Sequence, residues 1–352
     1  MSRIISKLNL PEPIINYSPS LDFYLSIVQT SEIDIRPWIF ENFIDVVYRC
    51  DEKMYSCEFL DMMHHTWMNT PFLDCSLLDR GFIESQQLDI VDLIKSLIDN
   101  KYYILLMVNT FYVSPYVTYK QQSLFHELLV HGYTDRGFLC SDYFDLQTRK
   151  DNVEILFDEL RLGYEKVERS RDYYKGLMVA KVCHSVYEGQ SYDKVNVFYL
   201  CEKIKHFLSD SLVQIHIPGF YHTKYGFRCG FSAFDELERK MKQCESVNAL
   251  IKPLHLFEQH EKLMLLRLAY LRENQGFRNL DEEIDKLKFL MKCTKGLKVK
   301  MLFFDRRKVE SYTNDFANTF TKIKKEYNNT LQSIVTDLEK YKEVNETATK
   351  LT

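Results

Sequence analysis

The hydrophobic positions of the chain follow two different patterns, and the change between them falls near residue 185. Before it, apolar runs of strand length alternate with amphipathic stretches such as LDIVDLIKSLIDN (88–100), where apolar residues recur every three or four positions. After it the pattern is helical almost throughout. The sequence therefore predicts an α+β domain over residues 1–182 and an all-helical domain over residues 183–352.

Within the first part, residues 102–112 are rich in β-branched and aromatic residues and predict a central buried strand. Two shorter runs, 125–132 and 137–143, flank a turn signal and predict a hairpin. Residues 55–75 have no clean period and predict a helix and a loop. The other expected elements are helices at 88–100 and 151–168, a strand at 177–182, a helix that begins at Ser18-Pro19-Ser20, and a helix followed by a strand over 36–48.

The second part predicts four helices and one long final helix, with a loop-rich connector at 214–231. The four helices are expected at 195–210, 233–244, 253–274 and 281–293. Apolar residues in the final helix recur every three or four positions, namely Phe316, Phe320, Ile323, Tyr327, Leu331, Ile334, Leu338 and Tyr341. Such a stripe either packs against the chain's own helices or forms the seam of a homodimer, and the pattern alone leaves both open.

Composition narrows the classes of function. The formal net charge of −4 over 352 residues gives no basic footprint for nucleic acid or an anionic membrane. The longest apolar run, 102–108, is far short of the roughly 20 residues that span a bilayer, and the N-terminus lacks a signal-peptide pattern. Nine scattered cysteines without a CxxC pair favour reduced thiols in a cytoplasmic protein. We expect no metal site and no other cofactor.

The predicted hairpin brings a histidine close to an acid. If its loop has an odd number of residues, His126 lies opposite Asp142 on one face, about 5 Å apart at Cβ. A two-residue loop would turn one of the two side chains to the other face. A carboxylate beside an imidazole orients it and stabilises its protonated form, as in catalytic triads. The alternative is a histidine at a strand edge and an unrelated turn aspartate.

The run 101–145, with HELLVHGY (126–133) and FLCSDYF (138–144), resembles the papain-like fold. In particular it is similar to the butirosin biosynthesis protein H-like family, which is related to double-glycine bacteriocin-processing peptidases. Residues 37–43 and 253–271 extend the resemblance to members found beside nonribosomal peptide assembly lines. The resemblance implies a papain-like domain with a cysteine nucleophile at the start of its first long helix, preceded by an oxyanion-hole side chain.

This chain has serine where the resemblance implies cysteine. The matching helix start contains Ser18 and Ser20, and no cysteine occurs before Cys50. Ser20 is matched to the nucleophile and Ser18 is the second choice, while Asn16 is the nearby amide for an oxyanion hole. Three explanations stay open: a serine enzyme, a cysteine-to-serine substitution made to trap a complex, or an inactive member. Helix capping is the alternative role for both serines.

The function that the resemblance implies is acyl transfer in secondary-metabolite biosynthesis. Ser20 would attack a carrier-protein phosphopantetheine thioester or an amide, with His126 as base and acid and Asp142 as its orienting partner. The acyl group would pass to an amine or to water. Cys57 would be another nucleophile if its region folded back on His126. The alternative function is a catalytically inactive papain-like protein that docks a carrier protein or peptide; plain double-glycine peptidase activity comes third, since the cysteine is missing.

Overall fold

The computed structural model describes residues 2–49, 57–59, 70–145, 148–183, 193–209, 227–243, 247–277, 279–303 and 309–350. Its contacts divide the chain into two compact units, the first formed by 1–32 and 67–190 and the second by 33–66 and 191–352. The expected contiguous ranges 1–182 and 183–352 differ from this division at residues 33–66. Its described residues, 33–49 and 57–59, pack on helices of the C-terminal half, in agreement with their place in the second unit.

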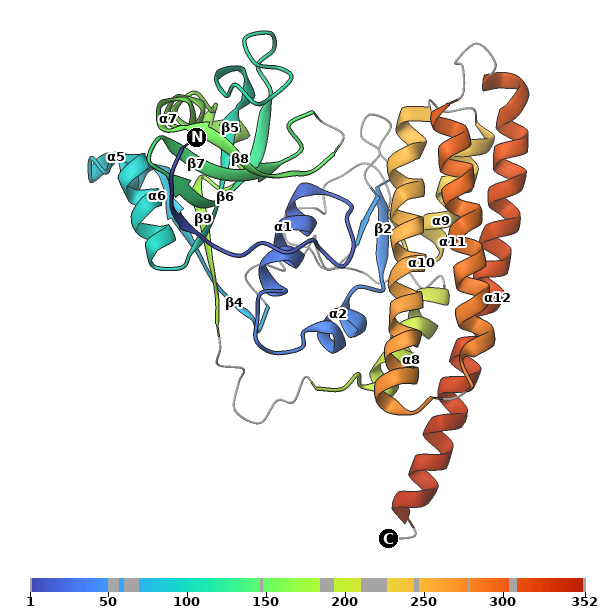
Figure 1. Cartoon of the computed structure of the whole chain (residues 1–352). Helices are drawn as coiled ribbons and strands as arrows, with labels where there is room; N and C mark the ends of the chain where they lie inside the picture. The colour runs from blue at the N-terminus through green and yellow to red at the C-terminus, as the bar shows by residue number, and fades with distance from the viewer. Residues whose placement is uncertain are drawn as a thin grey trace. The chain divides into compact units, whose positions relative to one another are not determined.

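The first unit is built on a seven-stranded antiparallel sheet in the order β4-β9-β5-β6-β7-β8, with β1 paired to the far part of β6 (Figure 1). All seven residues of β5 are buried, as the prediction of a central strand requires. The sheet together with the surrounding helices confirms the α+β class. Its strands are β1 (Ile4–Lys7), β4 (Leu73–Asp79), β5 (Tyr103–Asn109), β6 (Phe125–Thr134), β7 (Gly137–Asp142), β8 (Lys150–Leu156) and β9 (Gly176–Val182).

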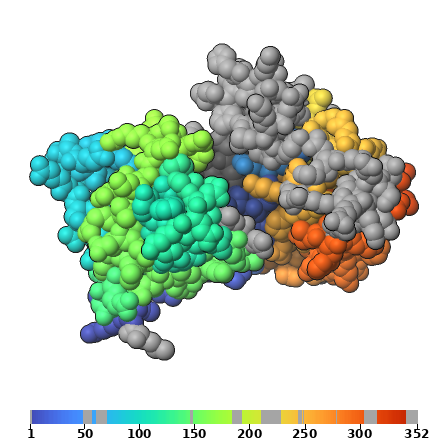
Figure 2. All heavy atoms as spheres, turned by 90° about the horizontal axis from the view of Figure 1, so that it is seen from above, coloured from blue at the N-terminus to red at the C-terminus, as the bar shows by residue number. Residues whose placement is uncertain are grey.

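The helices of the first unit are α1 (Pro19–Val28), α5 (Arg80–Ser85), α6 (Ile90–Asp99) and α7 (Phe157–Glu165), with 3-10 turns at Thr110–Tyr112 and Arg169–Arg171. The helix predicted over 151–168 is wrong at residues 151–156, because residues 150–156 pair with β7 as strand β8. Residues 55–75, predicted as a helix and a loop, form strands at 57–59 and from residue 73 onward, while residues 55, 56 and 60–69 lie outside the described residues. In Figure 2 the segments coloured cyan to green form one closely packed body.

The second unit is mainly helical, but the all-helical domain predicted over 183–352 is wrong at residues 227–229, which form a strand. Its helices are α2 (Arg36–Asn42), α8 (Val197–Leu208), α9 (Ser232–Lys242), α10 (Val247–Gln275), α11 (Asp281–Leu302) and α12 (Val309–Lys350). A small sheet has the order β10-β2-β3, with β2 (Val46–Arg49), β3 (Cys57–Phe59) and β10 (Phe227–Cys229). None of the helices described is long and apolar enough to cross a membrane.

The apolar stripe of α12 packs inside the second unit. Phe320, Tyr327, Leu331, Ile334 and Leu338 are fully buried, and α12 contacts α8, α9 and α11. The seam expected for a homodimer through this helix is therefore occupied by the chain's own helices. Of the two interpretations of the stripe, the structure supports internal packing.

Two buried side chains of α10 explain why residues 33–66 join the second unit. His260 donates from Nε2 to the carbonyl of Ile44 (2.8 Å) and accepts at Nδ1 from the Tyr327 hydroxyl (2.6 Å). Arg267 donates to the carbonyls of Phe40 (2.7 Å) and Phe43. Backbone carbonyls at the end of α2 thus find partners on α10 instead of water, which a buried turn requires.

Candidate active site

The β6–β7 hairpin has a two-residue turn, and a β-bulge in β6 shifts the register between the two strands. Tyr133 lies opposite Phe138 next to the turn, but beyond the bulge at His131 the register shifts so that Val130 lies opposite Cys140. A two-residue turn alone would put His126 and Asp142 on opposite faces of the sheet. The extra residue in β6 reverses the alternation once more and returns both side chains to one face.

The predicted pairing of His126 directly with Asp142 was wrong. Leu129 lies opposite Ser141, so His126 is diagonal to Asp142, two residues away from the position that was predicted. Within the sheet His126 instead faces Val108 of β5. The diagonal is within reach of a long side chain, and the Nδ1 atom of His126 lies 2.7 Å from Oδ2 of Asp142.

The His126–Asp142 pair is strongly ionic. The Asp142 side chain is fully buried and also accepts a hydrogen bond from the Tyr116 hydroxyl. Burial by itself lowers the pKa of His126, but the hydrogen bond and charge of Asp142, together with the charge of Glu127, outweigh it and raise the pKa to about 9. His126 is therefore an imidazolium at neutral pH. Its Nδ1 is engaged, and no described residue hydrogen-bonds to its Nε2.

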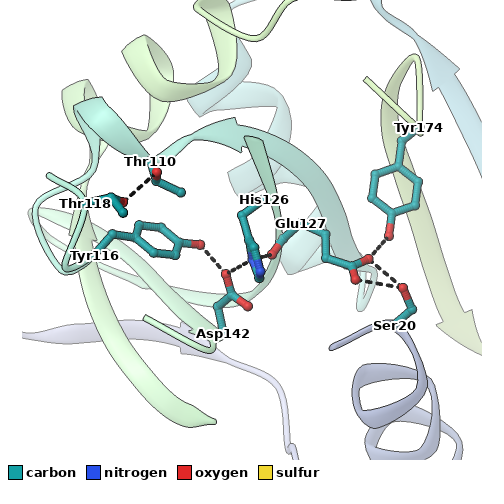
Figure 3. A network of polar contacts seen from close by, with 8 residues as sticks. All are labelled: Ser20, Thr110, Tyr116, Thr118, His126, Glu127, Asp142 and Tyr174. Atoms are coloured by element: carbon teal, nitrogen blue, oxygen red, sulfur yellow. Dashed lines mark hydrogen bonds and ion pairs between the residues drawn. The ribbon is translucent and has the colours of Figure 1, made fainter. Parts of the chain in front are cut away.

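Ser20, in the first turn of α1, hydrogen-bonds to a different carboxylate. Its hydroxyl donates to Glu127, at 2.6 Å from Oε2 and 2.8 Å from Oε1. The Tyr174 hydroxyl donates to the same Oε2 at 2.7 Å. Figure 3 shows Glu127 pointing from β6 toward Ser20 while His126 points toward Asp142. The structure thus brings Ser20, His126 and Asp142 to one end of β6, but the serine proton is directed to Glu127.

Buried polar contacts hold α1 against the sheet. Asp22 accepts from the backbone N–H of Tyr17 (2.8 Å) and from the hydroxyl of Tyr143, the residue after Asp142. Arg149 donates to the Ser26 hydroxyl (2.7 Å) and to the Asp22 carbonyl (3.2 Å). Burial raises the pKa of Asp22 to about 6 against the effect of these hydrogen bonds and of the Arg149 charge. The helix that carries Ser20 is therefore fixed beside the strand that carries Asp142.

Two of the remaining predicted residues lie near the same helix start, and the third belongs to the second unit. Ser18 is the N-cap residue of α1, but its side chain makes no capping hydrogen bond to any described residue. Asn16 is exposed just before the helix, and its oxyanion-hole role stays a prediction. Cys57 lies in β3 of the second unit, where burial raises the pKa of its thiol well above the ordinary value. A thiolate nucleophile at Cys57 is therefore unsupported.

Sequence reasoning missed Tyr116, Glu127 and Tyr174. Glu127 carried a usable signal, because it is an acid within the mainly apolar strand run FHELLVHGY. The two tyrosines carried none, since 47 residues separate Tyr174 from Glu127 and only the folded sheet brings them together.

Among the described residues no group of three or more His, Cys, Asp or Glu side chains could hold a metal ion. A scan against models of known protein families finds no match, and a search of curated proteins finds no similar sequence.

Proposed function

We propose that the first unit is a papain-like domain that carries out acyl transfer, with Ser20 as the nucleophile. The observation that supports this most is the Ser20 hydroxyl at 2.6 Å from the Glu127 carboxylate, beside an imidazolium whose Nε2 is not engaged by the described residues. A nucleophile bound to a base, with a second group able to give a proton, is the basic requirement of acyl transfer.

In the proposed reaction Ser20 Oγ attacks the acyl carbon of a thioester while Glu127 takes the serine proton. His126 donates its Nε2 proton to the leaving thiol as the C–S bond breaks, and Asp142 holds the ring. An amine or water then attacks the serine ester, giving its proton to the now neutral His126, and Glu127 returns its proton to Ser20. His126 thus acts first as the acid, since a pKa of about 9 leaves little neutral imidazole at pH 7, and as the base only after it has given its proton to the thiol.

The acyl donor is inferred from the resemblance. Similarity over residues 101–145 to butirosin H-like proteins suggests a carrier-protein phosphopantetheine thioester and a place in nonribosomal-peptide-type biosynthesis. An antiparallel sheet preceded by a helix that bears the nucleophile position is compatible with a papain-like domain. Amide-bond formation follows if the acceptor is an amine, and hydrolysis follows if it is water.

One observation favours a second function, a catalytically inactive papain-like protein that docks a carrier protein or peptide. The Ser20 hydroxyl and the Tyr174 hydroxyl share one carboxylate, and His126 is held in its charged form by Asp142. These contacts also describe a closed polar network that only fixes α1 to the sheet. Reactivity of Ser20 separates the two functions.

The test is acylation of the full chain by an acyl-thioester probe and by a fluorophosphonate, followed by intact-mass measurement between pH 6 and 9 (a range set by the pKa of about 9 for His126). We expect one adduct on the wild type, its loss in Ser20→Ala, and its retention in the matched control Ser18→Ala. Absence of any adduct from the wild type, with carrier-protein binding intact, would establish the docking function instead. Ser20→Cys should give a faster adduct that depends on His126.

A further inference from the structure

Helix α11 has two faces that carry large apolar side chains, and the described residues of the second unit cover only one of them. Its buried residues include Ile284, Leu287, Leu290, Leu297 and Met301, which pack toward α10 and α12 (Figure 1). Its other face exposes large apolar side chains: Phe289 (65%), Val299 (40%), Leu302 (57%) and, just after the helix, Phe303 (87%). A helix that is apolar on both sides is typical of one that is covered on both sides.

The exposed residues form a line. Phe289, Lys292, Gly296, Val299 and Phe303 recur every three or four positions, which is one side of an α-helix. We call these five residues the outer stripe. No described atom lies within 4 Å of the position that a Cβ on Gly296 would occupy, so no other part of the described chain covers the stripe there. Over its 14 intervals the stripe extends for about 21 Å along the helix.

The surroundings of the outer stripe are basic. From residue 286 to residue 304 the sequence has six lysines and no acidic residue. Lys286, Lys288 and Lys298 pair with acids of α10 or of the first turns of α11. Lys292, Lys295 and Lys300 are exposed and form no ion pair within the part of the chain that the structure describes. A local positive surface therefore exists on a chain whose net charge is −4.

Helix α10 packs against the covered side of α11 and is not part of the outer stripe, as the ion pair between Glu258 of α10 and Lys298 of α11 shows. The unpaired basic side chains are therefore local to α11. The net charge of the whole chain does not reveal them, because acids elsewhere compensate for their charge.

We propose that the outer stripe binds the surface of an anionic membrane. Its phenylalanine and valine side chains would enter the boundary between headgroups and acyl chains, while the lysines would contact anionic headgroups. A peripheral surface of this kind needs no membrane-spanning helix. The proposal is independent of the acyl-transfer function, since it uses residues of the second unit alone.

Three other occupants fit the surface less well. Protein interfaces are depleted in lysine and enriched in arginine, whereas this surface is mainly lysine. A second copy of the chain in a two-fold contact would set lysines against lysines. Single-stranded nucleic acid would use the lysines and phenylalanines, but it gives no reason for exposed Val299 and Leu302.

The test is co-sedimentation of the full chain with phosphatidylcholine vesicles, with and without phosphatidylserine. We expect binding to the anionic vesicles alone, weaker at high salt because the attraction is screened. Lys292→Glu/Lys295→Glu should reduce vesicle partitioning at least tenfold, by about 1 kcal/mol per charge at the surface, and Phe289→Ser/Phe303→Ser should reduce it as strongly. Matched controls in the first unit, Lys101→Glu/Lys166→Glu and Phe82→Ser, should bind as the wild type does.

Several results would overturn the proposal. Binding to neither vesicle, equal binding to both, or full binding by the folded charge-reversed variant would each exclude an anionic lipid surface. Circular dichroism shows whether each variant is folded. A single-stranded oligonucleotide that binds more tightly than the vesicles, and loses binding in the charge-reversed variant, would assign the surface to nucleic acid. Concentration-dependent dimers that the phenylalanine variant abolishes would assign it to self-association.

Discussion

The two carboxylates of the candidate site bind different side chains. Asp142 is buried and holds the His126 ring, whereas Glu127 is partly exposed and holds the Ser20 hydroxyl. His126 and Glu127 are consecutive on β6, so one strand carries both the proposed acid and the proposed base. Because each has its own partner, substitutions can address them separately.

We expect Asp142→Asn to lower the pKa of His126 from about 9 toward its ordinary value of 6.5, because burial remains while the hydrogen bond and charge of Asp142 are lost. NMR titration of the imidazole measures this.

A raised histidine pKa contributes stability that is complete below pH 6.5 and disappears as the pH rises to about 9, here about 3 kcal/mol. The variant should lack this loss between pH 6.5 and 9. The control Tyr116→Phe keeps the Asp142 charge and should keep the high pKa; an unchanged value in Asp142→Asn would contradict the assignment.

Replacement of Glu127 tests the proposed base. Glu127→Gln leaves a hydrogen-bond acceptor for Ser20 but cannot take its proton at neutral pH, so acylation should fall by about 10²–10⁴-fold. Tyr174→Phe removes one hydrogen bond from the same carboxylate and keeps its charge, so its loss should be much smaller. In the wild type the acylation rate should fall as the pH rises through about 9, because His126 then loses its proton. An acylation rate that is unchanged in Glu127→Gln would show that Glu127 is not the base for Ser20.

At the level of elements, the sequence predicted the parts that depend on local pattern. Strand β5 and the hairpin followed from β-branched runs and a turn signal, and α6 followed from its period of 3.6. Strand β8 did not, because its residues continue the apolar spacing of α7 and only pairing with β7 decides their conformation. The bulge at His131 was not predictable either. Next to it a Cβ on Gly132 would lie 2.8 Å from the Ser6 carbonyl of β1, which is a tertiary contact.

The bulge gives a prediction of its own. Deleting His131 removes the extra residue but leaves Val130 opposite Cys140 and Leu129 opposite Ser141, so His126 should stay on the face of Asp142 with a pKa near 9. The chain should lose stability, because the buried His131 side chain and its hydrogen bond with Ser141 are lost. NMR titration of His126 and urea unfolding measure the two effects, and His131→Asn is the control that keeps the backbone count. A folded deletion variant whose His126 pKa falls below 6.5 would contradict this register.

At the level of the whole molecule, each unit has its own buried titrating groups. In the second unit burial lowers the pKa of His260 to about 3. A histidine with a lowered pKa contributes stability that is complete above pH 6.5 and is lost as the pH falls toward 3. Glu261, whose pKa burial raises well above 4.5, acts in the opposite direction. The change of unfolding free energy with pH in the wild type therefore contains both effects. A variant is needed to isolate the contribution of His260.

We expect His260→Gln to be less stable than the wild type at pH 7, by about 2–4 kcal/mol, because stacking on Phe207 and a buried hydrogen bond are lost. The difference should shrink by about 1.4 kcal/mol per pH unit between pH 6 and 4. Urea unfolding followed by Trp38 fluorescence measures it, in a Trp67→Phe background that leaves one tryptophan, in the second unit. A difference that is constant with pH would mean that His260 titrates normally in the folded chain.

The division of the chain into interleaved units also constrains its synthesis. Residues 33–66 leave the ribosome early, yet their partners His260 and Arg267 on α10 follow about two hundred residues later. At about 5–20 residues per second this is a delay of tens of seconds at the slower rate. During that time Phe40, Phe43 and Ile44, all buried in the finished fold, have no helix to cover them. A chaperone that protects short apolar segments on the nascent chain would bind this protein there, and ribosome profiling of chaperone-bound chains should place its release after α10 emerges.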